Sequence, residues 1–254
     1  NELAALAYDF RFWGRSTQIA PPGDWRIWLM LAGRGFGKTR SGAEWVRMLA
    51  EDKRAQRIAL VAPTAADLRH VMIEGESGIL AISHPAFRPT FQASRQRLEW
   101  PNGAVAYGFS ADEPDRLRGP QHDAAWCDEV AAWRRPEAWD MLMLGLRLGT
   151  DPRVVATTTP KPTALIRRLA LDSGTVVTKG TTWENKGNLA PVFLAEIVRR
   201  YEGTRLGRQE LEAELLDDTP NALWTRDMIE GARVEKAPQL VRIVVAIDPA
   251  VSSG

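Results

Sequence analysis

Short apolar runs alternate along this chain with segments whose apolar residues recur every three or four positions. Short apolar runs bounded by turn residues are typical of buried parallel strands, and the periodic segments are typical of amphipathic helices. The alternation predicts an α/β fold with a mostly parallel sheet. We expect strands over Ile27–Leu31, Arg57–Ala62, Ala104–Phe109, Ala124–Cys127, Val154–Thr157 and Thr175–Thr178.

Helical patterns follow most of these strands. An Asn-Gly pair between two apolar stretches, within Arg97–Val105, predicts a β-hairpin added to the sheet. We expect helices over Lys38–Ala50, Ala66–Glu74, Pro136–Leu146 and Thr163–Leu171, the last with Thr163 as its N-cap.

The pattern changes after about Gly180, where the amphipathic helices Pro191–Tyr201 and Arg205–Leu216 follow with no strand between them. We therefore expect an α/β core over 1–180 and a small helical subdomain over 181–235. A strongly apolar strand, Leu240–Ile247, comes close to the last residue, and a buried strand needs neighbours for its backbone groups. Residues 236–254 are expected to be a linker and the first strand of a further, truncated domain.

Composition narrows the class of protein. The 254 residues include 33 basic and 32 acidic ones, a net charge of +1, which argues against a uniformly basic nucleic-acid coat but allows a local basic patch. A hydrophobic content of 44% is that of a globular chain. Apolar runs are far shorter than the roughly 20 residues that a bilayer requires, and the single cysteine, Cys127, forms no disulfide framework. We expect a cytoplasmic protein without a membrane span.

The segment Gly33–Thr39 has the pattern of a phosphate-binding loop, because it comes directly after a predicted strand and before a predicted helix. Glycines Gly33, Gly35 and Gly37 allow a tight turn, and the helix N-terminus favours an anion. In such a loop Lys38 reaches the β- and γ-phosphates of a nucleotide, and Thr39 gives a hydroxyl to Mg²⁺. Ala32 replaces the usual first glycine of the motif.

Two carboxylates follow the predicted strand Ala124–Cys127, at the edge where the phosphate loop is expected. Hydrolysis of a nucleoside triphosphate needs a carboxylate near Mg²⁺ and a group that orients the attacking water. We assign Asp128 to Mg²⁺ through water and Glu129 to the general base. The next strand ends in Thr157, Thr158 and Thr159, whose hydroxyls could contact the γ-phosphate, although a β-branched run is also common in a buried strand.

The order of these motifs resembles the large terminase subunit of tailed bacteriophages, prophages and gene transfer agents. The matching segments are Gly33–Thr39, Asp128-Glu129 and Thr157–Pro160, with Gln18–Pro22 upstream and Gly180–Asn185 downstream. The resemblance covers nearly the whole chain. It implies a P-loop ATPase of the ASCE type with a helical lid, followed in the full protein by an RNase H-like nuclease.

The resemblance also implies roles for single residues. Gln18 corresponds to a glutamine near the adenine, Arg34 to the arginine of the loop, and Thr157–Thr159 to the coupling motif. Arg118 resembles an arginine finger that acts on a neighbouring subunit, with Arg116 as its close competitor. Asp248 looks like the first metal ligand of the nuclease.

The function implied is an ATP-hydrolysing, Mg²⁺-dependent motor that moves double-stranded DNA into a procapsid. The expected partners are DNA, the portal protein, the small terminase subunit and further copies in a ring that is weak in isolation. A superfamily 2 helicase or translocase shares the phosphate loop and the Asp-Glu pair, but needs a second RecA-like domain, and only 94 residues follow Pro160. A scaffold that binds nucleotide without hydrolysis would have no use for Glu129.

Overall fold

The structure, a computed structural model, describes residues 6–216, 223–224 and 226–233. The chain divides into two compact units, Asn1–Leu216 and Asp217–Gly254. Helix α10 (Arg226–Gly231) belongs to the second unit. The predicted strand Leu240–Ile247 and the predicted nuclease ligand Asp248 lie outside the described residues. The predicted boundaries at residues 180 and 235 stay predictions.

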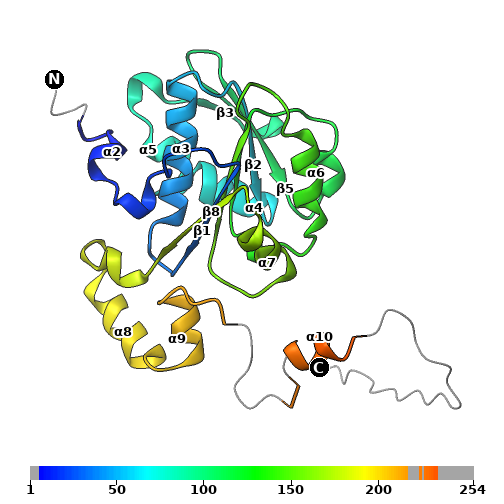
Figure 1. Cartoon of the computed structure of the whole chain (residues 1–254). Coiled ribbons are helices and arrows are strands. Elements are labelled where there is room, and N and C mark those ends of the chain that lie inside the picture. Colours follow the sequence, from blue (N-terminus) through cyan, green and yellow to red (C-terminus); the bar gives the residue numbers. More distant parts are fainter. Residues whose placement is uncertain (1–5, 217–222, 225, 234–254) are drawn as a thin grey trace, which may run out of the picture. The chain divides into compact units, whose positions relative to one another are not determined.

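The first unit is built on an eight-stranded sheet with the order β3-β4-β5-β2-β6-β7-β1-β8 (Figure 1). Across the sheet, the neighbouring pairs in the run β5-β2-β6-β7-β1-β8 are all parallel. Only the pairs β3-β4 and β4-β5 at one edge are antiparallel. The predicted α/β fold is confirmed, as are its six strands. The strands are β1 (Ile27–Ala32), β2 (Arg57–Ala62), β3 (Thr90–Gln92), β4 (Arg97–Glu99), β5 (Val105–Ser110), β6 (Ala124–Cys127), β7 (Arg153–Thr158) and β8 (Thr175–Gly180).

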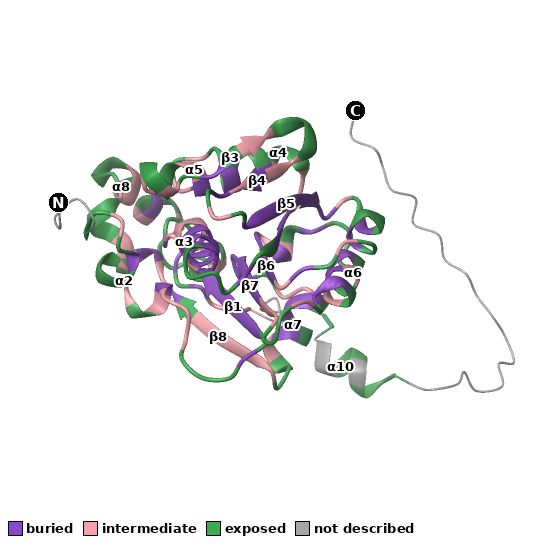
Figure 2. Ribbon diagram, turned by 90° about the horizontal axis from the view of Figure 1, so that it is seen from above, coloured by how far each residue is buried: buried purple, intermediate pink, exposed green. Residues whose placement is uncertain are grey.

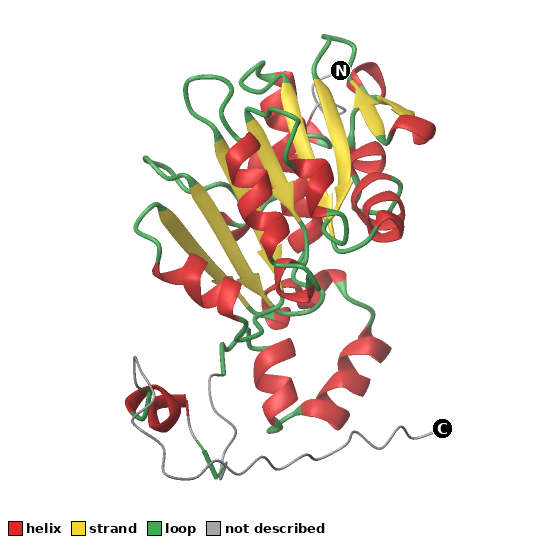
Figure 3. Ribbon diagram, turned by 90° about the vertical axis from the view of Figure 1, so that its right-hand side faces the viewer, coloured by secondary structure: helices red, strands yellow, loops and turns green. Residues whose placement is uncertain are grey.

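Helices cover both faces of this sheet (Figure 3). One face packs against α3 (Lys38–Glu51), α5 (Ile79–Ile82) and the segment after β2, and the other packs against α6 (Glu137–Gly145) and α7 (Ala164–Leu171). The central strands are therefore buried on both faces (Figure 2). This double burial explains why their sequences are continuous apolar runs rather than alternating ones.

Most local predictions are confirmed. The hairpin joins β4 to β5, and Thr163 caps α7 by accepting a hydrogen bond from the Ile166 N–H. The helix expected over Ala66–Glu74 is instead α4 (Ala65–Asp67) followed by a π-helical turn, η2 (Leu68–Ile73). Strand β3 was not predicted, since three residues carry too little periodicity. The shorter single turns are α2 (Phe10–Trp13), η1 (Ser16–Gln18), η3 (Pro85–Phe87), η4 (Ala93–Arg95), η5 (Pro114–Leu117) and η6 (Val130–Ala132).

Two helices follow the sheet within the first unit, α8 (Pro191–Tyr201) and α9 (Arg205–Glu210), preceded by the 3-10 segment η7 (Thr182–Asn188). The prediction of one helix over Arg205–Leu216 was too long. Ala213 has φ 57°, a left-handed conformation that a continuing helix excludes. Leu211 and Ala213 are buried, so tertiary packing ended the helix despite its periodic sequence. No helix among the described residues is long and apolar enough to cross a membrane.

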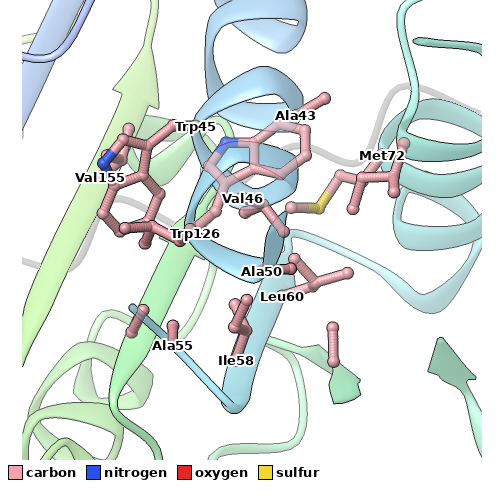
Figure 4. Close-up of a cluster of buried hydrophobic side chains, with 14 of the residues drawn as sticks. Ala43, Trp45, Val46, Ala50, Ala55, Ile58, Leu60, Met72, Trp126 and Val155 are labelled. Carbon is pink, nitrogen blue, oxygen red and sulfur yellow. The ribbon is translucent and has the colours of Figure 1, made fainter. Parts of the chain in front are cut away.

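A tight contact joins α3 to the centre of the sheet. Trp126 of β6 is fully buried against α3 (Figure 4). Gly42 lies opposite its indole ring, and a Cβ atom at that position would overlap the ring. Glycine is therefore required there by packing, in a helix interior where alanine would otherwise be preferred.

We predict that Gly42→Ala lowers the free energy of unfolding by about 1–3 kcal/mol, because the added methyl group overpacks the contact with Trp126. Urea unfolding would measure this change. Gly187→Ala is the matched control, since no heavy atom lies within 4 Å of its added Cβ. Because helix propensity alone favours alanine by about 0.5–1 kcal/mol, a stabilised Gly42→Ala variant would contradict the packing argument.

Candidate active site

The predicted phosphate loop joins β1 to α3 at the carboxyl edge of the sheet. Gly35 and Gly37 have φ values of 74° and 103°, which residues with a side chain rarely adopt. Phe36 at the top of the loop is fully buried, and a Cβ atom at Gly180 would overlap its ring. The apolar side chain thus anchors the loop against the end of β8, next to the start of α3.

Lys38 is the first residue of α3 and is buried. Its Nζ donates to the carbonyls of Ala32 at 3.0 Å and Gly33 at 3.3 Å, and lies 3.1 Å from Thr159 Oγ1. A carboxylate oxygen of Glu129 is 3.5 Å away. The ammonium group is therefore held at the edge of the sheet by neutral acceptors and one half-exposed carboxylate.

Asp128 follows β6 and is buried beside β7. Thr157 donates its hydroxyl to Asp128 Oδ1 at 2.6 Å, and the Trp126 indole N–H donates to Thr157 Oγ1 at 3.1 Å. Burial, and next the charge of Glu129, raises the pKa of Asp128 to about 7. A cation bound near this carboxyl group would lower its pKa and favour the ionised form.

Glu129 has φ 44°, so the chain turns sharply after Asp128 and separates the two carboxylates. Its Oε2 accepts the Thr159 N–H at 3.2 Å and lies 3.5 Å from Thr158 Oγ1. All three predicted threonines thus contact a predicted site residue. The order β6-β7-β1 explains this, because β7 lies between the strands that end in the carboxylates and in the loop.

Gln18 lies against the phosphate loop. Its Nε2 is 3.4 Å from the Phe36 carbonyl and 3.5 Å from the Gly37 carbonyl. Arg15, which sequence reasoning missed, donates to the same Phe36 carbonyl at 2.5 Å and stacks on the Phe36 ring. Burial lowers the pKa of Arg15. The predicted contact of Gln18 with adenine stays a prediction.

The segment after β8 also bonds to the loop. Thr182 Oγ1 donates to the Arg34 carbonyl at 2.7 Å, and Asn185 Nδ2 donates to the Gly35 carbonyl at 2.7 Å. The backbone N–H of Arg34 donates to the carbonyl of Glu210 at 2.7 Å, and its guanidinium lies 3.5 Å from the Glu210 carboxylate. Gly33 has no room for a Cβ atom, since one would lie 2.7 Å from the Leu211 carbonyl.

Part of this set lines one cavity of about 860 Å³, a volume typical of small-molecule sites, whereas Gln18, Asp128, Thr157 and Thr158 do not line it. Lys38, Thr39, Glu129 and Thr159 line it, together with Arg34. Sequence reasoning missed several lining residues that belong to no motif: Arg40, His70, Glu76, Ser77, Lys161, Asn188 and Glu210. His70 lies on the π-helical turn, Glu76 and Ser77 follow it, and Lys161, Asn188 and Glu210 come after β7 and β8, so only the fold brings them together.

The cavity does not include either arginine that we considered as a finger. Arg118 caps the C-terminal end of η5 and is exposed. Arg116 is also exposed, and its guanidinium lies 2.8 Å from the Glu113 carboxylate. The fold therefore does not bring Arg118 or Arg116 into the cavity of its own chain.

The candidate metal ligands at this site fit a Mg²⁺ ion that binds together with the phosphates of a nucleotide. Within the described part of the chain, no three His, Cys, Asp or Glu side chains converge on a point. Mg²⁺ typically takes one or two carboxylates from the protein and its other ligands from phosphates and water. The buried carboxyl of Asp128 and the hydroxyl of Thr39 are donors of this kind.

A family model and solved structures match this chain. The family model described as terminase large subunit, T4likevirus-type, N-terminal, matches residues 29–230. The large terminase ATPase domain of Thermus phage P74-26 is 18% identical, with a TM-score of 0.60 over 76% of this chain and 90% of that one. No curated protein matches the chain.

A large terminase from a thermophilic bacteriophage, in complex with ADP, is 15% identical. Its TM-score is 0.60, over 84% of this chain and 52% of that one, so this chain spans about half its length. At these identities the structural likeness shows the fold, and the family model carries the assignment. Because that model matches well over half of the residues, the chain belongs to the large terminase family, in the N-terminal region of its T4-like type.

Proposed function

We propose that this chain is the ATP-hydrolysing motor domain that drives double-stranded DNA into a viral procapsid. The observation that carries the proposal is the convergence of Lys38, Glu129 and Thr159 on one cavity, with the buried Asp128 beside them. In this set the Lys38 ammonium would bind phosphate and Glu129 would act as general base, both at the carboxyl ends of parallel strands. The family match favours a packaging motor over the helicase alternative.

The proposed reaction is attack of water on the γ-phosphorus of ATP, with cleavage of its bond to the bridging oxygen of ADP. Glu129 orients the water and accepts its proton, and Lys38 binds the β- and γ-phosphate oxygens. The Lys38 ammonium lies 3.5 Å from a carboxylate oxygen of Glu129. Phosphate oxygens would compete for that ammonium and free the carboxylate for the water.

Mg²⁺, when bound, would neutralise charge on the phosphates. Thr39 would contribute its hydroxyl, and Asp128 would act through water. Thr157 keeps the Asp128 carboxyl in place through its 2.6 Å hydrogen bond. Gln18 is proposed at the adenine and Arg34 at the phosphates.

The wider assembly remains part of the proposal. We assign 1–180 to the ATPase core, 181–235 to a lid, and 236–254 to a linker and the first strand of a nuclease that Asp248 would begin. Portal protein, small terminase subunit and a ring of copies are the proposed partners, with Arg118 reaching the next copy's site. Hydrogen bonds from Thr182 and Asn185 to the phosphate loop support a lid that follows the nucleotide state.

We predict that Lys38→Ala abolishes both ATP binding and hydrolysis, whereas Glu129→Gln keeps binding and loses at least about two orders of magnitude in turnover. Fluorescent-nucleotide binding and phosphate release would measure the two steps. The exposed Lys179→Ala and Glu137→Gln are the matched controls. Equal loss of binding in both site variants would contradict the division of roles.

We predict that stability without nucleotide or Mg²⁺ depends on the Asp128 proton. Its pKa of about 7 exceeds the ordinary value of 3.8, so the folded state holds more protons than the unfolded state between these pH values. Folding stability is therefore lost as pH rises through this window. Asp128→Asn should remove this loss, so at pH 8 its free energy of unfolding should exceed that of the wild type by up to about 4 kcal/mol. An equal difference at pH 5 and pH 8 would contradict it, and Asp140→Asn is the exposed control.

We predict that ATPase activity rises with protein concentration, because an arginine acting between copies is worth roughly 10³–10⁵ in rate. Arg118→Ala and Glu129→Gln should each be inactive alone. A mixture that assembles should recover part of the activity, since the Glu129→Gln copy supplies its arginine to the intact cavity of its neighbour. No recovery in a mixture shown to assemble would place the arginine in its own subunit or favour Arg116, which Arg116→Ala would test.

A further inference from the structure

Arginines gather around β5, near the β3 edge of the sheet, on the face that α6 and α7 cover further along. Side chains alternate between the two faces of a strand, and Phe109 of β5 belongs to the core on that face. Tyr107 therefore points the same way and is half-buried. Its register partner on β4 is Arg97. Figure 2 shows β4 and β5 toward the edge of the sheet that is opposite β8.

Guanidinium groups surround the Tyr107 ring. The carbon of the Arg57 guanidinium is 5.4 Å from the ring centroid, and that of Arg97 is 5.8 Å away. A cavity of about 320 Å³ lies beside the ring, lined by Arg57, Arg95 and Arg116 with Tyr107, Gly108, Phe109 and Pro120. No acidic residue of the described chain lines this cavity.

Nearby carboxylates balance only part of this charge. Arg97 pairs with Glu99 at 3.2 Å, and Arg116 pairs with Glu113 at 2.8 Å. Arg57 donates through Nε to the neutral carbonyl of Gln121 at 3.3 Å, and no ion pair is found for Arg57 or Arg95 within the described residues. The carboxylate of Asp123 also lies near Arg57, but it accepts the backbone N–H groups of Gln56 and Arg57. The guanidinium groups of Arg57 and Arg95 thus remain open to a phosphate oxygen.

The buried histidine beneath this face is uncharged at neutral pH. His122 is fully buried, with its ring 5.5 Å from that of Phe109. Burial, and next the charge of Arg57, lowers the pKa of His122 to about 4, so its ring is neutral at neutral pH. His122 therefore adds no charge to this face at neutral pH.

We propose that this arginine face, formed by Arg57, Arg95, Arg97, Arg116 and Tyr107, binds the phosphodiester backbone of double-stranded DNA. Guanidinium groups match phosphate oxygens in a bidentate geometry. Contacts to the backbone position a protein on DNA without reading the sequence, which suits a motor that moves any sequence. The inference rests on the proposed function, because DNA is the substrate of a packaging motor.

The test is anisotropy of a labelled duplex of about 20 base pairs, titrated with the protein at several salt concentrations. Each lost phosphate contact lowers the slope of log affinity against log salt by about 0.9. Arg57→Gln and Arg95→Gln should each show this drop and weaken binding by roughly 3–10-fold at low salt. Arg95→Lys should keep the slope, because it keeps the charge. Arg135→Gln is the control, an exposed arginine paired with Glu137 on the α6 side.

Three results would overturn the proposal: an unchanged slope in the Arg57→Gln/Arg95→Gln double variant, no binding of the duplex by the wild type at low salt, or reduced self-association with unchanged DNA affinity. The last would assign the face to contacts between copies. ATP hydrolysis without DNA should be the same in these variants as in the wild type, since neither residue lines the nucleotide cavity. Wild-type hydrolysis thus tests the proposed function separately.

Discussion

Hydrogen bonds to the carbonyls of the phosphate loop hold the candidate site together. Four consecutive carbonyls, from Arg34 to Gly37, accept side-chain donors: Thr182, Asn185, Arg15 with Gln18, and Gln18 with Ser41. The donors come from the segment before β1, from the segment after β8 and from α3, so all three segments help to hold this loop conformation. Segments distant in sequence are thereby coupled to the place where phosphate is proposed to bind.

The second constraint is the position of β7 between β6 and β1. A strand there carries three threonines into the space between the carboxylates and Lys38. Thr157 bonds to Asp128, Thr158 lies beside Glu129, and Thr159 contacts both Lys38 and Glu129. The buried indole of Trp126 fixes Thr157 from the other side, and the absence of a side chain at Gly42 makes room for that indole. Packing of Trp126 in the core therefore also sets the position of Thr157 at the site.

The raised pKa of Asp128 fits a site at which a bound cation stabilises the ionised carboxylate. Without a cation the buried carboxyl is costly to ionise, and burial next to the charge of the half-exposed Glu129 raises its pKa. The two carboxylates differ in environment, since one is buried on Thr157 and the other opens into the cavity. Neighbouring carboxyl groups with different environments can take different roles.

The sequence alone determined the parallel strands, the loop between β1 and α3 and the Asp-Glu pair, because buried parallel strands are continuous apolar runs and the motifs come at their ends, whereas the short strand β3 was missed. It also singled out Gln18 and Thr157–Thr159, although not their partners. Only the tertiary structure decided that α9 stops at Glu210, that η2 is π-helical, and that Arg15, His70 and Lys161 lie at the loop or cavity. Such contacts join segments far apart in the chain, and local periodicity does not predict which distant segments pack together.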